Sequence, residues 1–236
     1  MIEDAPVQEP ERLLAKVDVL KPLLPEEVER LASLSTSMCL EAGEVITPDE
    51  DRETILLLAS GRVRVHEPSA AGPELTISLV EEGTVVGQTG FAPRSSRALR
   101  VEALQPSSLL VLEWEDFENL VFRNPEVGIK TLRLLSKRLA VCEGRLSDMV
   151  HKEVPARLAG LIFRLSEYEG LVTDDGSCRI PTRYTHQQLA SLVGSNREAV
   201  TRAMGRLRRE GGVEVKNRYI HVVDIHALTR IARLER

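Results

Sequence analysis

Residues 185–202 have the sequence THQQLASLVGSNREAVTR, which is typical of two short helices joined by a sharp turn. Thr185 and, three residues later, Gln188 form a capping-box pair that can open a helix. Gly194 can adopt the left-handed conformation that a tight turn between two helices needs. The spacing therefore predicts a helix-turn-helix, a unit that places its second helix in the major groove of DNA.

The second predicted helix separates its charged side chains from its apolar ones. At about 100° per residue from Arg197, the two kinds occupy different arcs. The polar arc holds Arg197, Glu198, Thr201, Arg202 and Arg208, and the apolar arc holds Ala199, Val200, Ala203, Met204 and Leu207. Arginine can bond to both O6 and N7 of guanine, and glutamate can accept from the N4 amine of cytosine. We therefore expect Arg197, Glu198 and Arg202 to read bases of double-stranded DNA; the alternative is an ordinary solvated helix face.

Composition limits the class of protein. The 236 residues suit one large domain or two ordinary ones. No apolar run is long enough to span a membrane, and the acidic N-terminus lacks a signal-peptide pattern. The widely spaced Cys39, Cys142 and Cys178 suit a reducing compartment, so we expect a cytoplasmic protein. The sequence contains no C-x-x-C pair, P-loop or nucleophile elbow, which predicts no metal site and no catalytic site, hence no enzyme.

The net charge of −5 is divided unevenly along the chain. Residues 153–236 carry 14 Lys and Arg against 10 Asp and Glu, a balance of +4. Residues 1–152 carry the remaining 17 against 26, a balance of −9. A basic C-terminal part is what binding to DNA phosphates requires, and the acidic part would keep the protein away from random DNA.

The N-terminal half has a predicted tail followed by a β domain. Residues 1–11 are polar and acidic and are predicted to be a disordered tail. Residues 12–35 favour helix, and Pro25 begins a second short helix. Between residues 40 and 113, short β-type runs alternate with turns, which indicates a small β-barrel or sandwich. Examples of these runs are residues 55–58, 62–66, 75–79 and 109–112.

A long helix is predicted next, within residues 124–152. Its apolar residues are spaced by three and four in alternation, the pattern of a coiled-coil seam. They are Leu132, Leu135, Leu139, Cys142, Leu146 and Met149. We expect this narrow stripe to form a parallel homodimer seam; the alternative is a helix that lies on its own barrel. Cys142 would then face its symmetry mate, either as a small apolar filler or as a redox-sensitive thiol.

Residues 153–236 are predicted to form a winged helix-turn-helix domain. A helix is expected from Val154 to Glu167, followed by a loop at 174–177. After the helix-turn-helix, residues 213–215 and 219–223 favour two strands of a hairpin wing. Lys216 and Arg218 at its tip would contact DNA phosphates.

The order of a β-barrel, a long helix and a winged helix-turn-helix resembles the catabolite activator/cyclic-AMP receptor (CRP/FNR) family of bacterial transcription regulators. The run GSNREAVTR, residues 194–202, is similar to the Gly-x-Ser-Arg-Glu-Thr-Val-x-Arg run of that family. The resemblance implies an α+β fold with a cyclic-nucleotide-binding-type jelly roll in residues 12–123. It also implies a TGTGA-like palindrome as target, and activation through RNA polymerase contacted by the loop at 174–176. The residues that it places at DNA phosphates are Thr185, His186, Gln187 and Thr201, with His186 where the family has arginine.

A second segment, residues 86–91 together with residues 97–103, resembles the phosphate-binding cassette of the family's cyclic-nucleotide site. The resemblance implies an effector site at Gly87, Gln88, Gly90, Arg97, Ala98, Cys142 and Glu143. Glycines let backbone N–H groups approach a phosphate, and an arginine pairs with its charge. However, Gln88 replaces the ribose-binding glutamate, Ala98 replaces a phosphate-binding hydroxyl, and Cys142 and Glu143 replace the adenine-contacting threonine and serine. Three alternatives stay open: cyclic AMP, another small anion, or no effector and a constitutively active dimer.

A different class of function also fits this pattern. The chain would then be a cyclic-nucleotide sensor whose C-terminal domain binds a protein partner. The exposed arc with Arg197, Glu198 and Arg202 favours DNA over this alternative.

Overall fold

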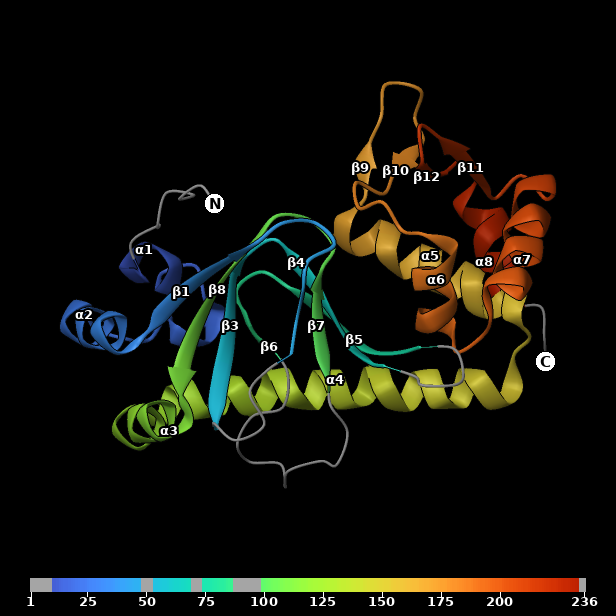
Figure 1. Cartoon of the computed structure of the whole chain (residues 1–236). Helices are drawn as coiled ribbons and strands as arrows, with labels where there is room; N and C mark the ends of the chain where they lie inside the picture. Colours follow the sequence, from blue (N-terminus) through green and yellow to red (C-terminus); the bar gives the residue numbers. More distant parts are fainter. Residues whose placement is uncertain (1–9, 48–52, 69–73, 87–98, 234–236) are drawn as a thin grey trace. The chain divides into compact units, whose positions relative to one another are not determined.

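The computed structural model describes residues 10–47, 53–68, 74–86 and 99–233 (Figure 1). The chain divides into two units. The first unit takes residues 1–68 and 77–140, and the second takes residues 69–76 and 141–236. Each unit is described by itself below.

Two four-stranded sheets form the β domain of the first unit. One has the order β1-β8-β3-β6, and the other has the order β2-β7-β4-β5. The strands of the first sheet are β1 (Thr36–Leu40), β8 (Ser107–Glu113), β3 (Thr54–Ser60) and β6 (Thr84–Val86). The strands of the second are β2 (Val45–Ile46), β7 (Arg100–Ala103), β4 (Arg62–Glu67) and β5 (Leu75–Glu81). The neighbouring strands run antiparallel, for example Ile55 opposite Leu112 between β3 and β8.

Strand β3 explains why two separate apolar cores exist. Successive side chains of a strand point to opposite faces. Leu56 and Leu58 are buried in the core between the two sheets, whereas Ile55 and Leu57 are buried in the core beneath the helices. Burying each of these side chains contributes about 1.5–3 kcal/mol, so the run 55–58 is apolar without interruption.

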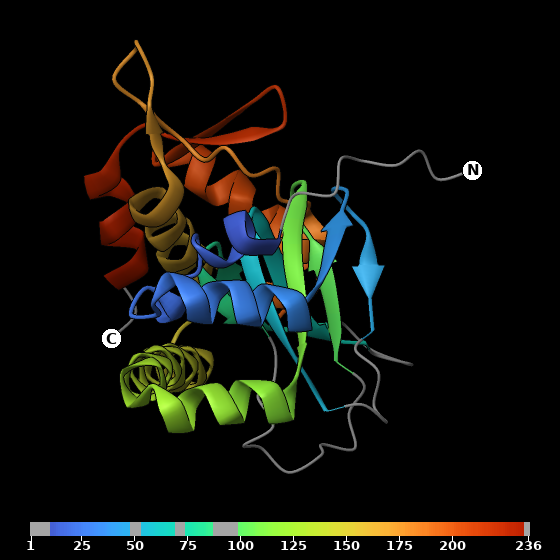
Figure 2. The ribbon, with the colours of Figure 1, turned by 90° about the vertical axis from the view of Figure 1, so that its left-hand side faces the viewer.

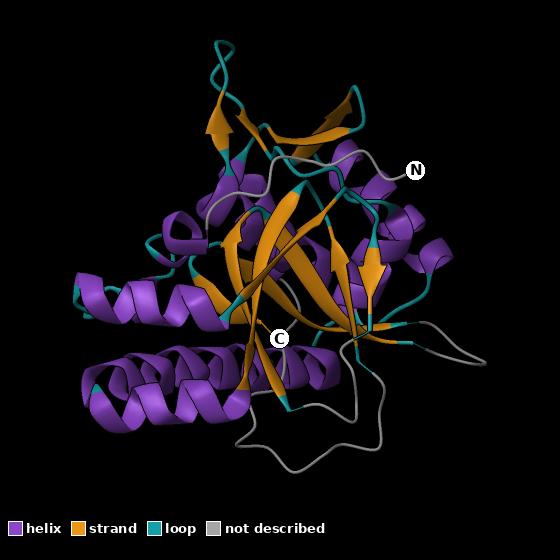
Figure 3. Ribbon diagram, turned by 60° about the vertical axis from the view of Figure 1, so that its left-hand side comes forward, coloured by secondary structure: helices purple, strands orange, loops and turns teal. Residues whose placement is uncertain are grey.

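Helices cover the outer face of the β1-β8-β3-β6 sheet. They are α1 (Pro10–Leu14), the 3₁₀ turn Asp18–Leu20, α2 (Pro25–Leu34) and α3 (Trp114–Arg123). Figures 2 and 3 show α2 and α3 on one side of the strands. Phe117 of α3 is fully buried in the core beneath these helices. Pro25 occupies the first turn of α2, as the sequence predicts.

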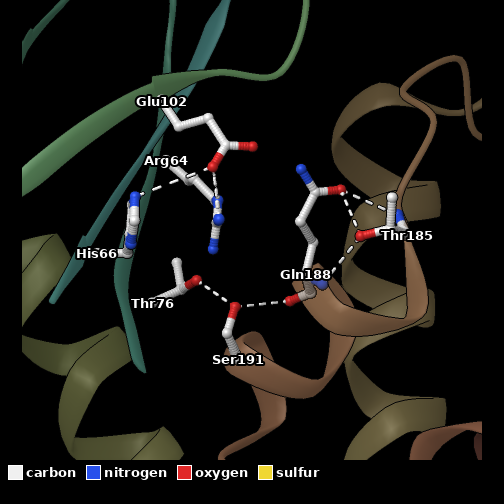
Figure 4. Close-up of polar contacts among 7 residues, drawn as sticks. All are labelled: Arg64, His66, Thr76, Glu102, Thr185, Gln188 and Ser191. Atoms are coloured by element: carbon white, nitrogen blue, oxygen red, sulfur yellow. Dashed lines mark hydrogen bonds and ion pairs between the residues drawn. The ribbon is translucent and has the colours of Figure 1, made fainter. Parts of the chain in front are cut away.

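The face of β4 that points away from the core between the sheets carries buried ionisable side chains instead of apolar ones. Arg64 Nε donates to Glu102 Oε2 of β7 at 2.8 Å, and His66 Nε2 lies 3.9 Å from the same oxygen (Figure 4). Arg62 pairs with Glu81 of β5 at 2.9 Å. The intervening Val63 and Val65 point into the core between the sheets. The polar and apolar side chains of residues 62–66 therefore lie on opposite faces of β4.

Helix α4 (Pro125–His151) continues from the first unit into the second. It lies within the predicted range 124–152, and its Val127 is buried in the core beneath the helices. The second unit then contains α5 (Val154–Glu169), α6 (His186–Val193), α7 (Arg197–Arg209) and α8 (Ile225–Arg233). A small sheet has the order β11-β12-β10-β9. Its strands are β9 (Leu171–Val172), β10 (Cys178–Arg179), β11 (Val213–Lys216) and β12 (Tyr219–Val222).

Most of the elements predicted from the sequence are present, and the structure adds several others, among them α3 and strands β1, β2, β6 and β7. The four β-type runs correspond to β3, β4, β5 and β8, and the two wing strands correspond to β11 and β12. Helix α8 and the β9–β10 hairpin were not predicted. Helix α1 begins at Pro10, so the last two residues of the predicted 1–11 tail are helical, and the rest of that tail lies outside the described residues.

Candidate nucleic-acid interface

The first helix of the helix-turn-helix begins as the sequence predicts. The Thr185 hydroxyl accepts from Gln188 N at 3.1 Å, and Thr185 N donates to Gln188 Oε1 at 2.9 Å (Figure 4). These two bonds satisfy backbone N–H groups that a helix start otherwise leaves unpaired. The Thr185 hydroxyl also donates to Gln188 Oε1 at 3.1 Å, so its hydrogen is already used within the cap.

The turn between the helices depends on glycine. Gly194 has φ +62°, in the left-handed region, and a Cβ there would lie 2.5 Å from Met149 Cε. Asn196 then caps α7, because its Oδ1 accepts from Ala199 N at 2.8 Å. The connection between α6 and α7 is therefore three residues long, and residues at both of its ends cap a helix.

Helix α7 buries one face and exposes the other, as predicted. Val200, Ala203, Met204 and Leu207 are buried. The exposed residues are Arg197, Glu198, Thr201, Arg202 and Arg208. None of the three predicted base-reading side chains forms an ion pair or a side-chain hydrogen bond with another described residue. Two guanidinium groups and one carboxylate are therefore available to a ligand near the start of the helix.

Helix α6 is braced against this exposed arc. His186 Nδ1 lies 2.8 Å from the Thr201 hydroxyl, which itself donates to the Arg197 carbonyl oxygen at 2.9 Å. The Thr201 hydroxyl has a single proton, so the imidazole donates to it from Nδ1, and Nε2 takes no part in this contact. Gln187 is exposed beside it. These two hydrogen bonds hold His186 and Thr201, both predicted to contact phosphates, against each other beside α7.

The wing is a hairpin with a tight two-residue turn. Asn217 and Arg218 both have positive φ, 52° and 68°, as a type I′ turn requires. Lys216 pairs with Glu214 at 2.8 Å and with Asp175 at 3.5 Å. These carboxylates raise the pKa of Lys216, which stays charged but partly neutralised. Arg218 is exposed and forms no ion pair within the described residues, so it is the stronger candidate for a phosphate contact.

The loop at 174–176 is the tip of the β9–β10 hairpin. Asp175 Oδ1 accepts from the Thr173 hydroxyl at 2.6 Å, from the Ser177 hydroxyl at 2.7 Å and from Ser177 N at 3.0 Å. These donors hold the pKa of the Asp175 carboxyl well below its usual range. The loop is thus internally ordered and carries a permanent negative charge.

Helix α4 exposes an apolar stripe. Leu132, Leu139 and Leu146, one heptad apart, are 60–65% exposed. Ile129 and Val150 are also exposed and extend the stripe at both ends, at a spacing of three or four residues. The other three residues of the predicted seam, Leu135, Cys142 and Met149, are half-buried within the chain. Ser136 and Glu143 thus alternate with the leucines in the exposed stripe.

Comparisons with known proteins agree with this architecture. Residues 156–231 match the model of the Crp-like helix-turn-helix domain, and residues 38–124 match that of the cyclic nucleotide-binding domain. The chain belongs to the CRP/FNR family of transcription regulators. It is 29% identical to the cyclic AMP receptor protein of Thermus thermophilus over 89% of this chain and 94% of that protein. It is 28% identical to the global nitrogen regulator of Synechocystis over 79% of this chain and 83% of that protein.

A solved structure shows the same fold. The crystal structure of a CRP/FNR family transcriptional regulator, also from Thermus thermophilus, superposes with a TM-score of 0.69 at 27% identity, covering 84% of this chain and 98% of that one. This agreement confirms the predicted fold class. The domain matches confirm the prediction of a transcription regulator with a helix-turn-helix domain, in a family that is not enzymatic. No helix in the described part of the chain is long and apolar enough to cross a membrane.

The effector site of this CRP/FNR regulator is described only in part. Gly87, Gln88, Gly90, Arg97 and Ala98 lie outside the described residues. Cys142 is half-buried on α4, and Glu143 is exposed beside it. Upstream on α4, Arg138 donates to the Val85 carbonyl oxygen of β6 and to the Thr84 hydroxyl at 3.1 Å. This contact anchors α4 to the strand that leads into the cassette, a link that the sequence pattern does not reveal.

Proposed function

We propose that this CRP/FNR regulator binds, as a homodimer, a palindrome of TGTGA-like half-sites. The observation that carries the proposal is the exposed arc of α7, where Arg197, Glu198 and Arg202 are free to contact bases. Their chemistry suits guanine and cytosine edges in the major groove. The capped start of α7 and its buried opposite face support the placement, because the helix can dock without unfolding its own core.

The exposed stripe of α4 supports the homodimer. Leucines at heptad spacing on a soluble helix bury their apolar surface when a second copy packs in parallel. A two-fold dimer presents two recognition helices, which suits two inverted half-sites about one turn of DNA apart. The dimer and the palindrome therefore support each other.

We further propose that DNA binding does not require cyclic AMP. By the resemblance, a thiol at Cys142 and a carboxylate at Glu143 stand where the family presents hydroxyls to adenine. Gln88 and Ala98 also lack the expected ribose and phosphate partners. Losing several hydrogen bonds of about 1 kcal/mol each weakens binding by orders of magnitude. Of the relatives named above, one is a cyclic AMP receptor protein, whereas the other, a global nitrogen regulator, is not named for cyclic AMP.

The β9–β10 hairpin is the proposed contact for RNA polymerase, in an activating role. Its tip holds the ordered Asp175 carboxylate, and Val172 beside it is 85% exposed. An exposed apolar side chain next to a fixed charge suits a protein contact. Transcription from a palindrome-bearing promoter with purified polymerase decides between activation and repression.

The experiment that tests DNA recognition is fluorescence anisotropy on two duplexes, one with inverted TGTGA half-sites and one scrambled. We expect selective binding by the wild type without cyclic AMP and no tightening when it is added. Arg197→Ala should lose about 1–3 kcal/mol per half-site on the palindrome alone, since a bidentate guanine contact is removed.

Each alternative result has a defined meaning. Selective binding that appears only with cyclic AMP contradicts effector independence but keeps the DNA assignment. If Arg197→Ala binds like the wild type, the base-reading assignment is wrong. Absence of DNA binding, together with nucleotide binding, would favour a sensor whose C-terminal domain contacts a protein.

A further inference from the structure

Two arginines lie over one aromatic ring at the base of the wing. Arg183 Cζ is 4.6 Å and Arg179 Cζ is 5.2 Å from the centroid of the Tyr219 ring. Tyr219 is the first residue after the wing turn, and Arg183 stands two residues before the cap of α6. The cluster Arg179–Arg183–Tyr219, which we call the arginine clamp, therefore joins the wing to the helix-turn-helix.

The chain around Arg183 is fixed so that this side chain points outward. Tyr184 donates its hydroxyl to Glu169 Oε1 of α5 at 2.9 Å, and Thr182 donates to Glu169 Oε2 at 2.5 Å. Both of these side chains are buried, and Arg183 between them is exposed. Glu169 thus holds the segment from one side and leaves the guanidinium of Arg183 on the other.

The clamp concentrates positive charge without a counter-ion. Neither Arg179 nor Arg183 forms an ion pair within the described residues. Arg179 Nε is buried and has no hydrogen-bond partner in the same part of the chain. The π-face of Tyr219 attracts both cations, but it leaves their N–H donors unused. Two adjacent guanidinium groups with free donors favour a bound anion.

The position of the clamp indicates which anion it binds. His186, three residues after Arg183, contacts Thr201 on the exposed arc of α7. Three residues of extended chain span about 10 Å, so Arg183 lies next to the edge that faces DNA. The wing tip with Arg218 follows on the other side of Tyr219. A duplex in contact with α7 therefore brings its backbone close to the clamp.

We propose that the arginine clamp binds a DNA backbone phosphate through Arg183, outside the bases read by α7. Tyr219 and Arg179 act as positioning residues that hold the Arg183 guanidinium in place. The inference rests on the proposed DNA-binding function and extends the contact surface from the recognition helix toward the wing. A phosphate contact adds affinity without sequence preference and increases the dependence of binding on salt.

The test is a salt titration of Arg183→Gln on the palindromic and scrambled duplexes. Each lost phosphate contact reduces the slope of log K against log salt by about 0.9. We expect a reduction of about 1.8 for a dimer, an equal loss of affinity on both duplexes, and unchanged selectivity. Arg12→Gln is the matched control, since it removes an exposed arginine from α1 in the other unit and should leave the slope unchanged.

Variants of Tyr219 separate positioning from folding. Tyr219→Phe keeps the ring and should retain the wild-type slope, whereas Tyr219→Leu should reduce it. Methylphosphonate linkages placed one at a time along the duplex should include a position where wild type loses affinity and Arg183→Gln does not.

The outcomes distinguish this inference from the proposed function. If wild type binds selectively and Arg183→Gln keeps its full salt slope, the clamp assignment is wrong and recognition by α7 stands. An equal loss of slope in Arg12→Gln would show a general charge effect and overturn the clamp. If wild type shows no selectivity, the proposed base reading fails, while a slope change confined to Arg183→Gln still supports a phosphate contact.

Discussion

At the scale of single residues, the helix-turn-helix depends on a few polar groups that complete its helix ends. The Thr185–Gln188 pair and the Asn196 cap satisfy N–H groups that α6 and α7 cannot satisfy internally. Gly194 provides the positive φ between them. These interactions span at most three residues, which is why the motif could be identified from the sequence.

We expect Asn196→Ala to lower the free energy of unfolding by about 1 kcal/mol, because the Ala199 N–H loses its acceptor. Urea unfolding followed by circular dichroism measures this change. Asn196→Asp is the control, since a carboxylate can accept the same bond. Equal stability of Asn196→Ala and wild type would show that the cap is energetically unimportant.

At the scale of elements, α4 shows how exposure refines a sequence pattern. The alternating spacing predicted six seam residues. The structure leaves Leu132, Leu139 and Leu146 exposed and turns Leu135, Cys142 and Met149 partly toward the chain itself. Glu143 then stands in the exposed stripe. In a parallel dimer it would face its own copy, so like charges would oppose association there.

This arrangement predicts opposite effects for two substitutions. Leu139→Glu should convert the proposed dimer to monomer at micromolar concentration, since it places a carboxylate at the centre of the stripe. Glu143→Leu should tighten the dimer, because it removes the opposing charges. Sedimentation equilibrium measures both. A Leu139→Glu protein that remains dimeric would place the interface elsewhere.

At the scale of the whole molecule, the chain combines two units of different charge. The acidic N-terminal part and the basic C-terminal part differ in composition, and each unit has its own apolar core. Proteins with separate cores often unfold in more than one step. Binding of DNA stabilises the unit that it contacts.

Calorimetric unfolding should therefore show two transitions. The palindromic duplex should raise the midpoint of one of them, by a stabilisation of about 2.7 kcal/mol when free duplex is at 100 times Kd. The scrambled duplex serves as the control and should shift that transition less. A single transition that moves as a whole would show that the two units unfold cooperatively.

Sequence reasoning succeeded where the determining contacts are local or periodic. Strand β3 was visible as an apolar run, the wing as two strands around a polar turn, and the two faces of α7 by their helical period. It missed α8 although local signals are present, since Asp224 Oδ1 accepts from His226 N and Ala227 N at the helix start and the buried Leu228 and Ile231 recur at helical spacing. The short β9–β10 pair was missed because two-residue strands have no readable alternation.

The sequence alone determined the order of domains, the family and the exposed arc of α7, because caps, turn glycines and helical periodicity act over a few residues. Only the tertiary structure decided which leucines of α4 remain exposed, and that Glu169 and Tyr219 hold Arg183 outward. Those contacts join residues far apart in the chain, and their formation depends on how α5, the wing and α6 pack. The local sequence cannot reveal these contacts, because glutamate, tyrosine and arginine are equally common on solvated surfaces where they make no such contact.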